Sequence, residues 1–235
     1  MKKTIDLEHG KISFENSNSN GKLYFYGDIV SSKWDAWGDD DRCPQDVADL
    51  LNSIPNDNPL DIYINSGGGD VHAGIAIYNQ LKRRSGKNTV HIDGLAASIA
   101  SVIAMAGDEI VMSKSAQLMI HKPWSSCWGN ADEMRKTAEV LDICQKSIMD
   151  IYMDNATEGT DRATIESMVN AETWLTGEQA GQYFKNITVC DAPAVAACVS
   201  GYFNHYKNMP QIEIKDKSKD EAAEIEIMRL KLKLI

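Results

Sequence analysis

The sequence has no Cys-x-x-Cys pair, although its 235 residues include five cysteines. An odd number of scattered cysteines disfavours both a disulfide framework and a structural zinc site. Free thiols are typical of a reducing compartment, so we expect a cytoplasmic protein. The N-terminus agrees with this expectation, because Asp6 and Glu8 stand where a secretory signal would need an apolar run.

Long apolar runs and an excess of basic residues are also missing. The most apolar stretch, residues 95–106, is too short to cross a bilayer and is expected to be a buried helix. The 34 acidic residues outnumber the 24 basic ones, for a net charge of -10. This balance disfavours binding driven by nucleic-acid phosphates. The short apolar stretch and the acidic charge therefore lead us to expect neither a membrane nor a nucleic-acid partner. No phosphate-loop or dinucleotide motif is present either, and we expect no cofactor and no metal.

The length allows one good core with short appendages. We divide the chain into a polar N-terminal segment (residues 1–21), one domain (residues 22–205) and a charged C-terminal tail (residues 206–235). In the tail, Ser218 and Glu221 form a possible capping box ahead of an apolar stripe, which predicts a terminal helix, with a frayed tail as the alternative.

Alternating strand and helix patterns predict an α/β fold. Short apolar runs predict strands at residues 23–27, 60–64, 89–92, 109–112 and 117–121. Helical periodicity predicts helices at residues 46–51, 71–81 and 96–106, and a long helix that begins after Asn130 and ends near residue 155. Two successive strand–turn–helix units, with turns at the glycines 67–69 and at Gly94, indicate parallel pairing.

Ser98 is the candidate nucleophile. It lies in Gly-Leu-Ala-Ala-Ser-Ile-Ala, directly after a predicted strand and near the start of a helix. Free backbone N–H groups and partial positive charge at a helix N-terminus would favour an activated hydroxyl. Taken locally, the small residues could equally serve close packing between helix and sheet.

His121 is the candidate general base, because it ends an apolar strand at the edge where α/β proteins place their sites. The competing histidines are His9, His72, His91 and His205, and His72 is the strongest rival because it follows the glycine turn. That turn could line an oxyanion hole or could be only a tight connection.

Three boxes in the same order carry a family resemblance. Tyr-Ile-Asn-Ser-Gly-Gly-Gly (63–69), Gly-Leu-Ala-Ala-Ser (94–98) and Met-Ile-His-Lys-Pro (119–123) resemble the signatures of the Clp protease proteolytic subunit over residues 22–191. The resemblance implies a ClpP/crotonase-like fold with a protruding handle helix. It also implies Ser98 as nucleophile, His121 as base, and the N–H groups of Gly68 and Ile99 as the oxyanion hole.

The resemblance places Glu172 where the family usually has the aspartate of the triad. The longer side chain would need a slightly different geometry, and a surface carboxylate is the alternative. Gly67 and Ile99 also depart from the usual proline and methionine.

The resemblance further implies a homo-oligomeric ring, heptameric or stacked as a double ring, that hydrolyses polypeptides. Its partners would be a separate AAA+ unfoldase, or phage capsid and scaffold proteins. The phage partners are suggested by Gly-Gly-Asp-Val (68–71) and Glu-Thr-Trp-Leu-Thr-Gly-Glu (172–178), which look most like the phage-encoded head maturation branch. Two other functions stay open. One is an assembly protein with impaired catalysis, and the other is a crotonase-type enzyme acting on acyl-CoA.

Overall fold

The computed structural model describes the backbone of residues 2–6 and 11–15, and residues 20–191 and 200–209 with their side chains. The predicted C-terminal helix with Ser218 and Glu221 lies outside these described residues. In the described part of the chain, no helix combines the length and apolar character needed to span a bilayer.

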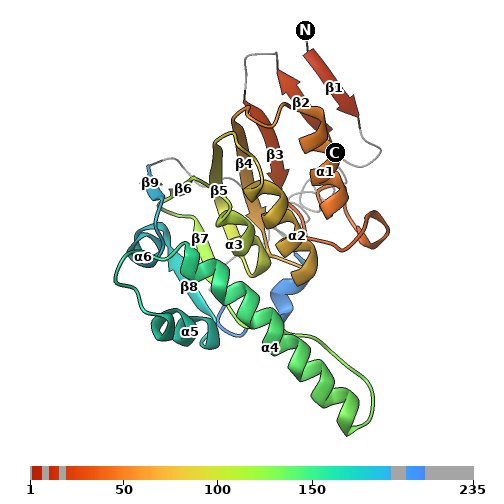
Figure 1. The fold of residues 1–235 in the computed structure, drawn as a ribbon, viewed down its shortest axis with the longest axis vertical. Helices are drawn as coiled ribbons and strands as arrows, with labels where there is room; N and C mark the ends of the chain where they lie inside the picture. The colour runs from red at the N-terminus through yellow and green to blue at the C-terminus, as the bar shows by residue number, and fades with distance from the viewer. Residues whose placement is uncertain (1, 7–10, 16–19, 192–199, 210–235) are drawn as a thin grey trace, which may run out of the picture.

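A seven-stranded sheet forms the centre of the described domain (Figure 1). Its main path is a run of parallel neighbours: β3 (Gly21–Phe25), β4 (Leu60–Ser66), β5 (Asn88–Ala97), β6 (Glu109–Ser113) and β9 (Ile187–Cys190). A branch leaves β5, where β7 (Gln117–Ile120) pairs in parallel and β8 (Thr173–Thr176) pairs antiparallel with β7. The predicted α/β class with parallel pairing is confirmed.

Helices α1 (Pro44–Ser53), α2 (Val71–Lys82) and α3 (Ile99–Ala104) connect and cover the strands. Figure 1 shows α2 and α3 side by side against the sheet. Their apolar side chains pack on alternate residues of the strands, so that Ile62, Ile77 and Ile92 are almost completely buried. Burial of each such side chain contributes about 2 kcal/mol to the free energy of unfolding.

The long helix α4 (Ala131–Asp154) begins at the predicted cap. The Asn130 side chain accepts hydrogen bonds from the backbone of Asp132 and Glu133, and the Glu133 carboxylate accepts one from the Asn130 N–H. The buried residues of α4 all lie from Cys144 onward, and the first half projects away from the sheet (Figure 1). α5 (Arg162–Asn170) and α6 (Gly177–Tyr183) follow in the chain, and α5 packs on α4.

Two local expectations were wrong. Gly94 lies inside β5 rather than at a turn, and the next helix begins at Ile99 rather than at residue 96. The physical reason is pairing between distant segments, because residues 95–97 continue β5 by bonding to β7.

The structure also contains elements that the sequence pattern did not predict. They include a hairpin of β1 (Lys2–Asp6) and β2 (Lys11–Glu15), and two 3-10 helices, η1 (Lys33–Asp35) and η2 (Gly201–His205).

Candidate active site

Ser98 occupies the junction between β5 and α3 in an unusual backbone conformation. Its φ of 54° and ψ of -126° lie outside the regions that residues with a side chain normally adopt. Such a conformation costs on the order of 1–3 kcal/mol and persists only where the surrounding structure holds it. Here the Ser98 N–H donates to the Met119 carbonyl at 3.0 Å, which ties the junction to β7.

His121 reaches Ser98 because β7 runs beside the end of β5. Ala97 pairs with Met119, so the residues that follow each strand emerge at the same edge of the sheet. The distance between His121 Nε2 and Ser98 Oγ is 2.7 Å. This is hydrogen-bonding distance for a general base and a hydroxyl nucleophile.

The pKa of His121 is lowered to about 4, mainly by burial, while the negative charge of Glu172 opposes the shift. The imidazole is therefore neutral at pH 7. A neutral imidazole can accept the hydroxyl proton, so the electrostatics suit a general base.

Glu172 lies directly before β8 and has a φ of 51°. It is near His121 because Ile120 at the end of β7 pairs with Thr173 at the start of β8. Its carboxylate accepts hydrogen bonds from the backbone N–H groups of Lys207 at 2.9 Å and Asn208 at 2.7 Å, and a longer one from the Trp174 indole at 3.4 Å. Among the described residues, none of its hydrogen-bond donors is His121. The charge of the predicted third residue thus affects the pKa of His121, but its carboxylate is hydrogen-bonded to the backbone of residues 207 and 208.

The two expected oxyanion donors are both next to Ser98, Gly68 through space and Ile99 along the chain. A Cβ added to Gly68, whose φ is 108°, would lie 2.7 Å from the Ser98 Cβ. The Gly68 N–H donates to the Ser66 hydroxyl at 3.2 Å. The Ile99 N–H is in the first turn of α3, where an amide has no acceptor within its own helix.

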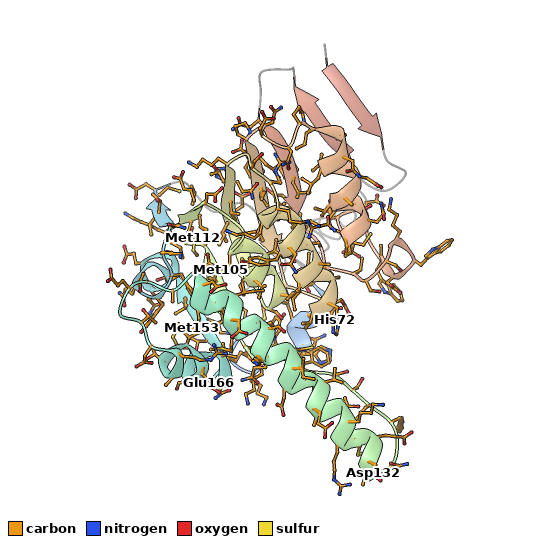
Figure 2. The ribbon with its side chains drawn as sticks, viewed as in Figure 1. His72, Met105, Met112, Asp132, Met153 and Glu166 are labelled. Atoms are coloured by element: carbon orange, nitrogen blue, oxygen red, sulfur yellow. The ribbon has the colours of Figure 1, made fainter. Side chains whose placement is uncertain are left out.

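The Ser98 and His121 side chains open into a cavity of about 330 Å³, bounded by α4 and by aromatic side chains that include Trp124 and Tyr206. The rival His72, which Figure 2 shows at the start of α2, lines the same cavity. Its Nε2 lies 3.8 Å from the Cys144 Sγ. Within the described residues, no group of three or more His, Cys, Asp or Glu side chains could hold a metal ion.

Neither His91 nor His205 lines the cavity. His91 stacks on Tyr63, His205 stacks on Trp124, and His9 lies outside the described residues.

Sequence reasoning missed Tyr206, which packs edge-on against the His121 ring at a centroid distance of 5.2 Å. Its hydroxyl donates to the Gly67 carbonyl. Burial raises the pKa of Tyr206, and its hydrogen bond with Ser98 opposes part of that rise. The aromatic run Tyr-Phe-Asn-His-Tyr (202–206) is the signal that could have drawn attention to this segment.

Known proteins share sequence and fold with this chain. The sequence profile described as Clp protease matches residues 43–184, which is more than half of the chain. The chain is 31% identical over 135 residues to an ATP-dependent Clp protease proteolytic subunit from Bacteroides fragilis, an alignment that covers 57% of this chain and 64% of that relative. It is 34% identical over 148 residues to one from Ligilactobacillus salivarius, covering 61% and 74% of the two chains.

A mutant of ClpP1 from Listeria monocytogenes has a similar fold, with a TM-score of 0.59 and 23% sequence identity. That likeness covers 73% of this chain and 91% of the other. The profile match, the curated relatives and the shared fold lead to one conclusion. The chain belongs to the Clp protease family.

Proposed function

We propose that this chain is a serine-type endopeptidase of the Clp proteolytic-subunit type, which cleaves peptide bonds through an acyl-enzyme on Ser98. The observation that carries the proposal is the 2.7 Å contact between Ser98 Oγ and His121 Nε2 at a strained junction. Hydrolysis by this route needs a nucleophile, a neutral base and donors for the oxyanion, and the neighbouring groups supply candidates for each.

In the proposed reaction, His121 Nε2 takes the proton from Ser98 Oγ as the oxygen attacks the substrate carbonyl carbon. The N–H groups of Gly68 and Ile99 stabilise the resulting oxyanion. The tetrahedral intermediate expels the amine, which receives the proton from His121. Water then attacks the carbonyl carbon of the ester while His121 takes one of its protons. The second tetrahedral intermediate breaks its bond to Ser98 Oγ, which receives that proton from His121, and the acid is released.

Two groups must move before this reaction. The Gly68 N–H must turn from the Ser66 hydroxyl toward the oxyanion, and Glu172 must turn from its present donors to accept a hydrogen bond from His121 Nδ1. A carboxylate in that position would stabilise the imidazolium that forms during attack.

Assembly into a homo-oligomeric ring, heptameric or stacked as a double ring, is part of the proposal. The projecting half of α4 exposes Met134, Val140 and Ile143 to 50%, 44% and 66%. Apolar side chains on a projecting helix support a contact with further subunits. Native mass spectrometry would measure the subunit number, and a monomer at working concentration would count against the ring.

The partners in the proposal are polypeptide substrates and a separate AAA+ unfoldase that feeds them. Among polypeptide substrates, phage capsid or scaffold precursors are the more specific proposal. Incubation with such precursors, with and without an unfoldase, would test this part.

The direct test is labelling by a fluorophosphonate, followed by intact-mass measurement. We expect one adduct on the wild type, none on Ser98→Ala or His121→Ala, and slower labelling of Glu172→Ala. His91→Ala is the matched control, because this histidine stacks on Tyr63 away from the serine, and it should label at the wild-type rate. An adduct that persists in folded Ser98→Ala would refute the proposed nucleophile.

The second candidate function is an assembly protein that keeps the fold without catalysis. The bonds of Glu172 to the backbone of Lys207 and Asn208 favour it, because the carboxylate does not orient the histidine in this arrangement. This candidate predicts a folded oligomer that gives no adduct and hydrolyses no peptide.

A further inference from the structure

Residues 200–209 lie beyond the stretch that the Clp protease profile matches, yet they contact the candidate site. This segment, called here the C-terminal strap, contains η2 and the residues that follow it. It contacts the glycine turn, the Ser98–His121 pair and Glu172. Each contact concerns a group that the proposed function requires.

At the glycine turn, the strap occupies the space that a side chain on residue 67 would need. A Cβ on Gly67 would lie 2.4 Å from both Cβ and Oγ of Ser200. Ser200 is held there by a hydrogen bond of 2.5 Å to the Asp28 carboxylate, which also accepts the Gly201 N–H at 3.4 Å. The strap therefore requires glycine at position 67, where the family resemblance leads one to expect proline.

At the Ser98–His121 pair, the strap contributes Tyr206, which is only 8% exposed. Its ring covers an edge of His121 and its hydroxyl bonds to the Gly67 carbonyl. The phenol thus fills space beside the nucleophile. A substrate carbonyl and its flanking chain would have to enter the same region.

At Glu172, the strap supplies two backbone donors. The N–H groups of Lys207 and Asn208 bond to the two carboxylate oxygens, and the Asn208 side chain also donates to the carbonyls of Ala171 and Glu172 at 2.7 and 3.2 Å. Hydrogen bonds to a charged acceptor are among the stronger ones in proteins. They hold the carboxylate on the strap and away from the histidine.

We propose that the C-terminal strap is an inhibitory latch that holds the active site in a resting state and must be released before catalysis. The inference rests on the proposed peptidase function. Release would free Glu172 to bond to His121 and would clear the space beside Ser98 for a peptide. Substrate binding or contact with a neighbouring subunit would supply the free energy for release.

The test compares rates of fluorophosphonate labelling in the full chain. Asn208→Pro removes a backbone donor to Glu172 together with the side-chain bonds. Tyr206→Phe keeps the ring but removes the hydroxyl, which bonds to the Gly67 carbonyl and to Ser98. We expect Asn208→Pro to label about tenfold faster than the wild type, which corresponds to the loss of one hydrogen bond to a charged group. Tyr206→Phe should also label faster. Lys207→Ala, which keeps the backbone N–H that bonds to Glu172, should match the wild type.

Hydrogen exchange gives an independent readout. In the wild-type adduct, the amides of Lys207 and Asn208 should exchange faster than in the free protein, because the latch has opened. If both latch variants fold and label no faster than the wild type, the latch is refuted while the peptidase proposal stands. If neither the wild type nor the latch variants form an adduct that depends on Ser98, the peptidase proposal fails and the latch fails with it.

Discussion

Acidification should destabilise the folded protein through His121. Burial lowers the pKa of this side chain from 6.5 to about 4 in the folded state. Between these two values the unfolded chain binds a proton that the folded chain does not bind. Stability therefore rises with pH in this window, and it is lost as the pH falls from 6.5 toward 4.

The size of the effect follows from the two pKa values. Between pH 7 and pH 5, protonation of His121 in the unfolded chain should lower the free energy of unfolding by about 2 kcal/mol. Below pH 4 both states carry the proton, and the loss levels off at about 3 kcal/mol. Other titrating groups add their own pH dependence, so the contribution of His121 must be isolated by substitution.

Urea unfolding of the wild type and of His121→Asn at pH 7 and pH 5 would isolate it. The variant has no titrating group at this position. Between pH 7 and pH 5 its free energy of unfolding should therefore fall by about 2 kcal/mol less than that of the wild type. NMR titration of the His121 ring in the folded protein would give the folded-state pKa directly. Equal losses in the two proteins, together with a titration midpoint near 6.5, would refute the argument from burial.

Two further substitutions test the packing that holds the site. Gly68→Ala should reduce the rate of fluorophosphonate labelling at least about tenfold, because the new Cβ would lie 2.7 Å from the Ser98 Cβ. The control is Gly159→Ala, which is also at positive φ but has nothing within 4 Å of the new Cβ, and it should label at the wild-type rate. Tyr152→Phe removes the buried 2.7 Å hydrogen bond to Ser101 and should lower the free energy of unfolding by about 1 kcal/mol in urea titrations; an unchanged midpoint would contradict this.

Local sequence patterns predicted much of the sheet because burial in a parallel sheet imposes apolar strands followed by amphipathic helices. The helix after the glycine turn was predicted at residues 71–81 and extends over Val71–Lys82. The cap of the long helix at Asn130 could also be predicted from the sequence, because a capping box depends only on residues close together in the chain. The boundary at Gly94 was missed because the continuation of β5 depends on pairing with β7, more than 20 residues away.

The sequence alone determined the α/β class and, through three ordered boxes, the pairing of Ser98 with His121 as candidates. Only the tertiary structure decided that these side chains lie 2.7 Å apart, because that distance depends on the register between β5 and β7. It also decided the present bonds of Glu172 to the strap, since no local pattern links residue 172 to residues 207 and 208. Local composition determines elements and residue types, whereas long-range strand pairing and packing determine which of those residues meet.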